Sequence, residues 1–558
     1  MKQETKKLLF SKERGKAELC VFFAYIIGVA VIGIFHEPWF DEAQAWSISR
    51  ASYHDIIFKI PHFEGHPPLW SLILSVFSKL GAPFELSLKA VNLAFCAGAV
   101  WLILYRSPFP KIFRCIIPFT FYFFYQTAVI CRPYSVMLLA LTLLACGYKN
   151  RNEKPLGYVL PMLLLCGIHA YGLILACGLC LVWVGEIFSE AIREKRFGSV
   201  FKDKRCYMLL CILIFAVFVA YLIMPNEQTR YMNMDDTFSQ RLKQLYLLLV
   251  YPIDSLFGIY IDVDAIKQTT TGLITTMIGG ALLLAVLFAV ARKNKKLLTF
   301  AVPYFMFLLF GVFKYMYWNH ISISTFFLMF TVWIIMDDEN AALPDVFYTI
   351  RSKVESKGTV ILAKAAVIGM TALPLGWTVF CSAADIALPY GMRDVAQYIK
   401  DNDIEGHNIM MYWLFSYKGG NSLTDPENYY KAENRINMSN EQCDGSALSP
   451  YFDTNIFYNF NITHHENTYQ TYIKTPDEDN ERNFALWREY GYPEYMFCKC
   501  PLNSVFPELE YEDIDKMYDL EATFERNVIY KFSVITEAVQ IYHIKPEYAH
   551  LLKDNSSR

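Results

Sequence analysis

The chain has 558 residues, of which 54% are hydrophobic and 19% are charged, and its formal net charge is −3 at pH 7. Soluble proteins usually carry about 25% charged residues. The apolar residues of this chain also come in blocks of roughly 17 to 25, the length of a helix that crosses a bilayer. These features exclude an ordinary soluble enzyme, predict an α-helical polytopic membrane protein, and give no reason to expect a nucleic-acid partner.

The first apolar block, at about residues 18–35, follows a basic N-terminal stretch that includes Lys6, Lys7, Lys12, Arg14 and Lys16. Basic flanks favour the cytoplasmic side of a membrane, so this block is typical of a signal-anchor helix with its basic end inside. No cleavage site follows it, and we expect it to remain as the first transmembrane helix.

The block at 67–81 decides the predicted topology. The later candidate spans are 86–105, 112–127, 133–147, 155–168, 170–187, 206–224, 271–291, 297–313, 320–336 and 359–382. If the block at 67–81 also crosses, the basic loops at 106–114 and 189–205 fall outside, against the preference of Lys and Arg for the cytoplasm. If it lies in the interface, these loops and those at 149–154 and 292–296 all fall inside. The block is short and begins with two prolines, which suits an interfacial helix. We therefore predict about eleven transmembrane helices, with interfacial helices in the first outside loop.

This topology places six segments outside the membrane: 36–85, 128–133, a turn near His169, 225–270, 314–319, and everything after about Asp385. The tail is polar and contains one helical segment, at 391–402, and three strand-like runs, at 409–413, 528–532 and 538–544. We expect two domains, a transmembrane domain at 1–384 and a small extracytoplasmic α/β domain at 385–558. Three cysteines lie in this tail, and the sequence does not reveal their pairing: Cys443, Cys498 and Cys500.

The first outside loop carries two adjacent carboxylates, Asp41 and Glu42, just beyond the first helix. A carboxylate in apolar surroundings can act as a general base on a hydroxyl. A structural interpretation is also open, because Asp41 followed by Gln44 makes a capping box for a helix over 42–50. The same loop offers three further polar candidates: Arg50, Glu64 and His66.

The other outside segments add basic and aromatic side chains. Arg132 lies in the second outside loop, where it could anchor a helix at the interface or clamp a phosphate with its planar fork. His169 lies at the next outside turn, and Lys314 and His320 flank a later one. Each has a structural interpretation alone, but the predicted topology places all of them on one side of the membrane. Few ionisable residues lie within the helices, whereas ion-coupled transporters place charges at the midplane.

At this point the chain resembles the glycosyltransferase C superfamily, membrane enzymes that take sugars from polyprenyl-phosphate carriers. They include protein O-mannosyltransferases and aminoarabinose transferases. The resemblance covers about residues 18–336 and rests on three short runs: Phe40-Asp41-Glu42-Ala43, Glu64-Gly65-His66-Pro67-Pro68-Leu69 and Ile130-Cys131-Arg132-Pro133-Tyr134-Ser135. The Asp-Glu pair is the most specific of them.

The resemblance implies that Asp41 is the catalytic base, that Glu42 supports it, and that basic side chains at the outer interface hold the lipid phosphate. Arg132 is the first candidate for that contact, with weaker candidates in His66, Glu64, Arg50, His169, Lys314 and His320. Several relatives have an acidic residue in the second outside loop that is linked to metal or acceptor binding. This chain has none there, so we expect neither a metal nor another cofactor.

We therefore expect an inverting transfer of a sugar from a polyprenyl-phosphate donor to an extracytoplasmic acceptor hydroxyl, in contact with membrane lipids. The family likeness and the lack of eukaryotic targeting signals favour a bacterial plasma membrane. A transporter or flippase of a lipid-linked or small polar substrate is the alternative. It predicts an internal repeat and broken helices, and neither is clear in the sequence. The sugar, the carrier length, the acceptor and the oligomeric state stay open.

Overall fold

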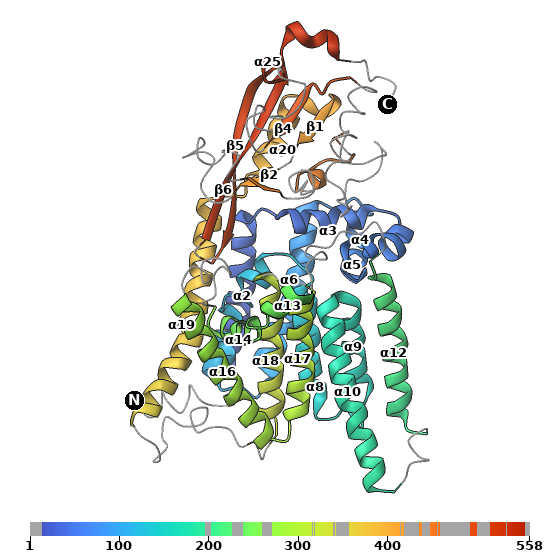
Figure 1. Ribbon diagram of the computed structural model, residues 1–558, viewed down its shortest axis with the longest axis vertical. Coiled ribbons are helices and arrows are strands. Elements are labelled where there is room, and N and C mark those ends of the chain that lie inside the picture. Colours follow the sequence, from blue (N-terminus) through green and yellow to red (C-terminus); the bar gives the residue numbers. More distant parts are fainter. Residues whose placement is uncertain are drawn as a thin grey trace.

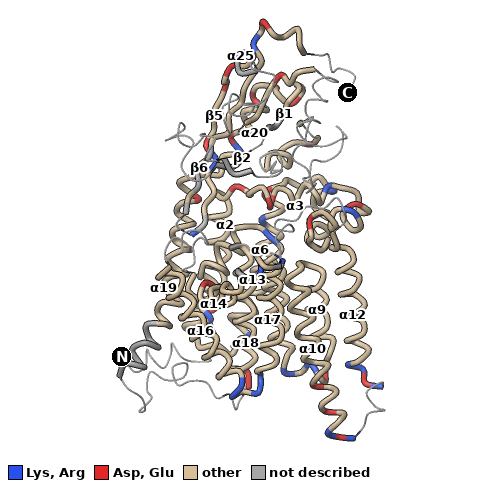
Figure 2. Tube along the Cα trace, viewed as in Figure 1, with Lys and Arg blue, Asp and Glu red and all other residues tan. Residues whose placement is uncertain are grey.

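The computed structural model describes residues 14–195, 202–225, 238–258, 270–314, 316, 318–338, 341, 357–412, 415–417, 435–437, 447–454, 456–457, 491–498, 514–531 and 533–552. Helices form a long bundle, and a small sheet from the C-terminal part of the chain sits on one end of it (Figure 1). We call this the sheet end and the opposite end the basic end. Lys and Arg residues gather at the tips of several helices at the basic end (Figure 2).

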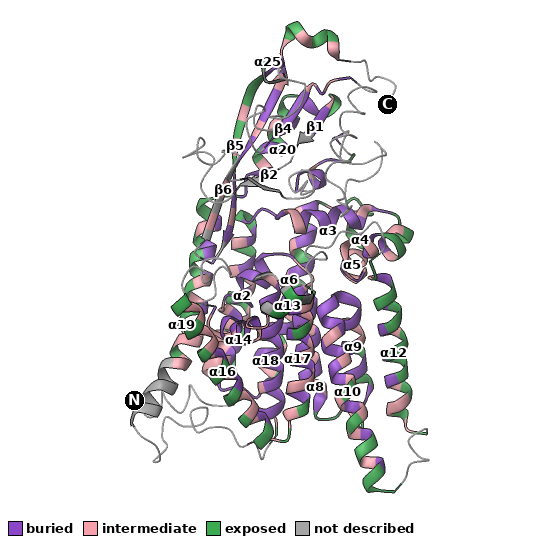
Figure 3. Ribbon diagram, in the orientation of Figure 1, coloured by how far each residue is buried: buried purple, intermediate pink, exposed green. Residues whose placement is uncertain are grey.

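Six stretches of helix within the described residues are long and apolar enough to cross a membrane. They are α2 (Lys16–Phe35), α6 (Phe84–Arg106), α10 (Ala170–Arg193), α12 (Lys204–Leu222), α16 (Thr270–Lys293) and the segment Ala366–Asp401, which begins within α19 (Lys357–Ala387). Shorter apolar helices complete the bundle: α8 (Tyr134–Tyr148), α9 (Leu156–Ile168), α14 (Leu247–Phe257), α17 (Leu297–Phe313) and α18 (Ile321–Met336). The outer helices expose large apolar side chains while the inner ones are buried (Figure 3), as expected for a surface that faces lipid.

Short helices lie across the sheet end of the bundle in the first loop (Figure 1). They are α3 (Phe40–Arg50), a π-helical turn (Asp55–Lys59), α4 (Ile60–Glu64) and α5 (Leu69–Ser78). The ten residues of α5 reach only about 15 Å, half of the hydrocarbon thickness. A helix of that length does not cross a bilayer by itself.

The structure corrects the expectation of one continuous helix over 112–127. The segment is divided into α7 (Lys111–Ile116), a 3-10 turn (Ile117–Phe119) and a π-helical turn (Tyr125–Val129). At one end Arg114 forms a fully buried ion pair with Glu18 of α2 at 2.6 Å, and the other end leads to Arg132 at the sheet end. The segment therefore traverses the bundle as irregular backbone. Such backbone is tolerated at membrane depth only where protein buries it, and its aromatic run at 121–125 is buried.

The structure also corrects the expectation that the segment at 225–270 lies wholly outside the helical bundle. Within it, α14 is packed against α16, α17, α18 and α19, and most of its residues from Val250 to Ser255 are buried. Residues 226–237 and 259–269, on either side, lie outside the described residues. The apolar run of α14 is only 11 residues long, too short to be recognised as a span.

The C-terminal sheet has four strands in the order β1-β4-β6-β5. Their bounds are Ile409–Tyr412 for β1, Tyr495–Cys498 for β4, Tyr518–Tyr530 for β5 and Ser533–Ile544 for β6. The predicted helix at 391–402 is confirmed as α20 (Met392–Asp401). The predicted strand positions are confirmed too, although β5 and β6 form a much longer hairpin. Cys498 is buried and unbridged, while Cys443 and Cys500 lie outside the described residues.

The β5–β6 hairpin extends from the sheet down to the bundle (Figure 1). At its turn, the Nζ of Lys531 lies 2.6 Å from the Oδ1 of Asp254 in α14, and neither side chain is exposed. The thiol of Cys381 in α19 donates to the carbonyl of Lys531 at 3.1 Å. A turn of the C-terminal region is thus anchored inside the helical bundle, which corrects the expectation that ionisable groups are nearly absent there.

Candidate functional site

Asp41 and Arg132 form an ion pair at the sheet end of the bundle. Asp41 lies in the first turn of α3, and Arg132 lies just before α8. The Asp41 side chain is 30% exposed and the Arg132 side chain 13% exposed. The pair therefore joins an ionised carboxylate to a guanidinium fork at a position that a substrate can reach.

The structural alternative for Asp41 was wrong. Helix α3 begins at Phe40, one residue before Asp41, and the backbone N–H of Trp39 donates to the Glu42 carboxylate at 2.9 Å. Gln44 bonds to Glu64 at 3.2 Å instead of closing a capping box with Asp41. Glu42 therefore has the capping role, and the start of the helix leaves Asp41 without one.

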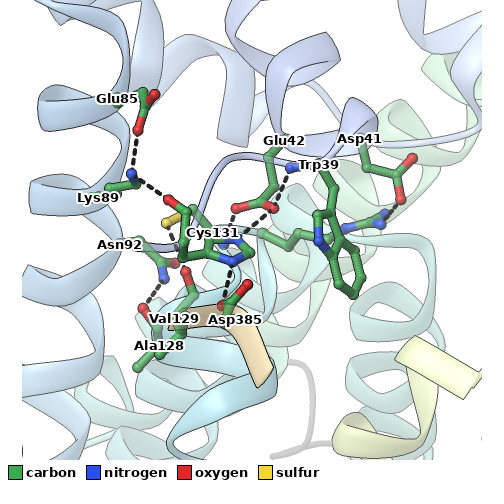
Figure 4. Close-up of polar contacts among 12 residues, drawn as sticks. Trp39, Asp41, Glu42, Glu85, Lys89, Asn92, Ala128, Val129, Cys131 and Asp385 are labelled. Atoms are coloured by element: carbon green, nitrogen blue, oxygen red, sulfur yellow. Dashed lines mark hydrogen bonds and ion pairs between the residues drawn. The ribbon is translucent and has the colours of Figure 1, made fainter. Parts of the chain in front are cut away.

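Glu42 is fully buried and holds the two halves of the ion pair in register (Figure 4). Its Oε1 accepts the backbone N–H of Cys131 at 2.6 Å, directly before Arg132. Its Oε2 accepts the N–H of Trp39, two residues before Asp41. Because one carboxylate fixes the backbone beside both partners, Glu42 is a positioning residue for the Asp41–Arg132 pair.

His36 and Asp385 extend this network and were missed in the sequence. The His36 ring bonds to Glu42 through Nε2 at 3.1 Å and to Asp385, near the end of α19, through Nδ1 at 2.8 Å. Burial alone would lower the pKa of His36, but the carboxylates of Asp385 and Glu42 raise it to about 10. A charged imidazolium therefore compensates two buried carboxylates. The only signal in the sequence was the position of both residues at the ends of spans.

Three histidines from separate loops come together near Arg132. The His169 ring centroid lies 4.7 Å from that of His66 and 5.6 Å from that of His320. The Tyr134 ring centroid lies 5.6 Å from that of His169, and the guanidinium carbon of Arg132 lies 5.6 Å from the Tyr134 ring centroid. We call His66, Tyr134, His169 and His320 the histidine cluster. The predicted convergence of these loops is thus a contact between side chains.

The histidine cluster is neutral at pH 7. Burial lowers the pKa of His66 to about 4. Burial, together with the positive charges that His66, His320 and Arg132 can carry, lowers the pKa of His169 well below its ordinary value. The Nδ1 of His169 accepts the backbone N–H of Tyr171 at 3.2 Å. A neutral ring with an accepting Nδ1 carries its proton on Nε2, so His169 presents a donor.

Several buried polar atoms of this cluster have no hydrogen-bond partner among the described residues. Within the described part of the chain, His66 Nδ1, His169 Nε2 and the Tyr134 hydroxyl are buried without a hydrogen bond. Buried polar groups are nearly always hydrogen-bonded to protein, water or ligand. The cluster therefore offers neutral donors and acceptors to a polar molecule. No group of three His, Cys, Asp or Glu side chains in the described ranges is arranged to hold a metal ion.

Glu64 lies at the end of α4 and accepts a hydrogen bond from Gln44, which is on the same helix as Asp41. Burial raises the pKa of the Glu64 carboxyl to about 7, although the bond from Gln44 opposes the shift. Near neutral pH this group therefore exists in both forms and can either donate to or accept from a hydroxyl.

Two candidates have other positions. The Arg50 guanidinium donates to the backbone carbonyls of Phe452 at 2.8 Å and Asp453 at 2.5 Å, so it joins the first loop to the C-terminal region. Lys314 follows the last residue of α17, and its side chain is exposed. The expectation that these two cations contact substrate is therefore not supported by their positions.

No protein-family model matches the chain, and no curated protein matches it. The structure is similar to the cryo-EM structure of the arabinofuranosyltransferase AftD from Mycobacteria. The sequence identity is 10% and the TM-score is 0.42. The match covers 96% of this chain and 40% of the AftD chain, so this chain spans less than half the length of that protein.

The arrangement as a whole favours transfer chemistry at one surface. A carboxylate that can accept a proton lies beside a guanidinium that can bind an anion. Next to them are neutral rings with unused hydrogen-bonding atoms, in the geometry expected around a polar but uncharged group such as a sugar. The carboxylate, the cation and the polar cluster come from loops separated by up to 279 residues between Asp41 and His320 (320 − 41).

Proposed function

We propose that this protein is a membrane glycosyltransferase that moves a sugar from a polyprenyl-phosphate donor to an acceptor hydroxyl outside the cytoplasm. The observation that carries the proposal is the ion pair of Asp41 and Arg132 beside the histidine cluster. It brings a base, an anion-binding group and neutral polar side chains together at one end of an apolar bundle. The Asp41 and Arg132 runs that resemble the glycosyltransferase C superfamily supply both partners of this pair.

In the proposed reaction Asp41 accepts the proton of the acceptor hydroxyl. The hydroxyl oxygen then forms a bond to the anomeric carbon while the bond from that carbon to the phosphate oxygen breaks, with inversion at the carbon. The polyprenyl phosphate leaves with the bonding electrons, and the Arg132 guanidinium stabilises its growing charge. Positioning by Glu42 keeps base and guanidinium at a fixed separation, which is where most of the acceleration would arise.

The histidine cluster is assigned to the sugar. Its rings are neutral because burial lowers the pKa values of His66 and His169, and a neutral sugar hydroxyl needs donors and acceptors instead of a full charge. Glu64, with its pKa near 7, would bind a hydroxyl of the sugar or of the acceptor. The sugar and the acceptor are not specified by these contacts.

A donor panel tests the proposal directly. Purified protein would be incubated with polyprenyl-phosphate pentoses and hexoses and with candidate acceptors, and free polyprenyl phosphate would be measured by liquid chromatography and mass spectrometry. We expect at least one donor to be consumed by the wild-type protein. If folded protein consumes none of them, or if Arg132→Ala and Asp41→Asn consume as much as wild type, the proposal fails.

The guanidinium of Arg132 should not be replaceable by an ammonium. Arg132→Lys keeps the charge but loses the planar fork that binds two phosphate oxygens at once, so we expect kcat/KM for the donor to fall by about tenfold, and further in Arg132→Ala. Lys314→Ala is the matched control, because it removes an exposed cation next to the last turn of α17 without touching the cluster. Equal losses in the control would mean that only general positive charge matters.

We also propose that the sheet end and the C-terminal region face the outside, in a bacterial plasma membrane. The support is the gathering of Lys and Arg at the opposite end (Figure 2), which favours the cytoplasm. A membrane-impermeant thiol reagent applied to intact cells should label Glu405→Cys in the C-terminal region and spare Asn150→Cys between α8 and α9, as read by peptide mapping. Both positions are exposed. The reverse labelling would invert the topology.

A further inference from the structure

A second polar site lies at the basic end of the bundle, far from Asp41. A cavity of about 340 Å³ opens there between the ends of α8 and α18 and the start of α17. Its charged lining combines three cations and two carboxylates: Lys149, Arg151, Lys296, Asp337 and Asp338. A cavity that presents both signs of charge within one small volume can select a ligand that also carries both.

One wall of this cavity is rigid. Two cations lie over the Tyr148 ring, with the guanidinium carbon of Arg151 at 3.9 Å and the Nζ of Lys296 at 4.8 Å from its centroid. The Tyr148 hydroxyl bonds to Thr299 of α17 at 3.1 Å, and Arg151 pairs with Glu186 of α10 at 2.6 Å. Contacts with α8, α10 and α17 therefore hold the Tyr148 ring and the two cations in place.

Lys296 lacks a carboxylate partner. In the described ranges no Asp or Glu lies within ion-pair distance of its Nζ, and its contact is the Tyr148 ring. Burial, followed by the charge of Arg151, lowers the pKa of Lys296, while the nearby carboxylates of Glu186 and Asp338 oppose the shift. An anion bound beside Lys296 would oppose the shift further.

Two carboxylates in the same lining favour a cation. Asp337 and Asp338 follow the last residue of α18 and line the same cavity. With Glu186, which pairs with Arg151, the acidic groups number three, equal to the three basic groups Lys149, Arg151 and Lys296. The charges of the site therefore balance, and a simple anion would lie among carboxylates as well as cations.

We propose that this cavity binds a phosphate that carries a primary ammonium, the chemistry of the phosphoethanolamine headgroup. The phosphate would lie against Lys296 and Arg151, and the ammonium against Asp337. Basic pockets between membrane helices commonly bind lipid headgroups, and this one lies at an end of the bundle where headgroups are present. The inference is independent of the proposed glycosyltransferase function, because no residue of the Asp41 site takes part.

Native mass spectrometry of the full-length protein tests this inference. The protein in detergent would be titrated with phosphatidylethanolamine, phosphatidylcholine and phosphatidylglycerol, and separately with free phosphoethanolamine and inorganic phosphate. We expect phosphatidylethanolamine or free phosphoethanolamine to bind with preference over the others, and the better of these two identifies the source. Equal binding of phosphatidylglycerol and phosphatidylethanolamine, or no binding of either ammonium-bearing probe, overturns the proposal.

Two variants separate the charges of the site. Lys296→Gln and Asp337→Asn should each weaken binding of the ammonium-bearing phosphate by about tenfold, because each removes a charge-assisted contact. Lys195→Gln removes an exposed lysine at the same end and should leave binding unchanged. Size-exclusion profiles would verify that the variants are folded. Stronger binding of phosphatidylglycerol in Asp337→Asn, with no loss for phosphatidylethanolamine, would show an anion site and contradict the proposal.

Discussion

Replacing Asp41 with asparagine is expected to reduce sugar transfer by about 10²- to 10⁴-fold, the usual loss for a positioned general base. The substitution keeps the size of the side chain, and Asp41 does not cap α3, because Glu42 accepts the N–H of Trp39. Its contribution to stability is the partly exposed ion pair with Arg132, a contact that contributes about 1 kcal/mol or less. Turnover and melting temperature should therefore respond very differently.

Three variants make the Asp41 experiment decisive. Asp55→Asn changes a carboxylate in the same loop, which accepts a hydrogen bond from the Ser52 hydroxyl at 2.9 Å. This variant should keep wild-type rates. Glu42→Gln keeps an oxygen for the N–H of Cys131, so its loss should be milder than that of Asp41→Asn. If Asp41→Asn is active and Glu64→Gln is inactive, the base is Glu64, whose pKa near 7 would then appear as a limb in the pH profile.

Most residues of the candidate site, although not His36 and Asp385, could be found from the sequence, but their partners could not. Asp41, Arg132, His66, His169 and His320 stand at the ends of apolar blocks, and the predicted topology placed them on one side of the membrane. Hydropathy orders such positions along the membrane normal and leaves their arrangement within the plane undetermined. For this reason the contact of Arg132 with Asp41, and that of His66 with His169, had to come from the structure.

The roles of Asp41 and Glu42 show a second limit. The pattern of Asp41 and Gln44 fits a capping box better than that of Trp39 and Glu42, because the indole of Trp39 offers no acceptor. A shift of two residues in the helix start, from 42 to Phe40, decided between them. Helix ends are the least certain feature of a sequence pattern. Arg50 shows the same limit, since a charge in an outside loop does not indicate whether its partner is a substrate or the carbonyl of Phe452.

The fold itself was predictable where segments were long and uniformly apolar. The prediction failed where buried backbone is irregular, as in 112–127. This segment contains Pro118 and a run of aromatic residues that pack equally well in helix or turn. The prediction also failed for α14, which packs against four helices and contacts the hairpin turn at Lys531, 277 residues away from Asp254. Such pairing depends on tertiary contacts, and a single sequence contains no local signal for it.

Lys531→Met is expected to lower the free energy of unfolding by about 3–5 kcal/mol, because it leaves the Asp254 carboxylate buried without its cation. The pair is fully buried at 2.6 Å, and the Tyr122 hydroxyl donates a further bond to the Asp254 Oδ1 at 2.8 Å. Thermal unfolding in detergent, followed by tryptophan fluorescence, would measure the loss. Limited proteolysis should also show release of the β5–β6 hairpin from the bundle.

The double variant Lys531→Met/Asp254→Leu should recover most of that stability. Replacing both members of a buried ion pair by apolar groups is often neutral or stabilising, since the cost of desolvating two charges disappears together with their attraction. Tyr122 keeps a partner in the backbone carbonyl of Asp254, at 3.2 Å. The partly exposed pair of Lys545 and Asp519, 3.5 Å apart at the other end of the hairpin, is the control, and Lys545→Met should cost about 1 kcal/mol or less. If the single and double variants lose the same stability, the turn is not held by this pair, and the hairpin must be anchored by its apolar contacts with α19 instead.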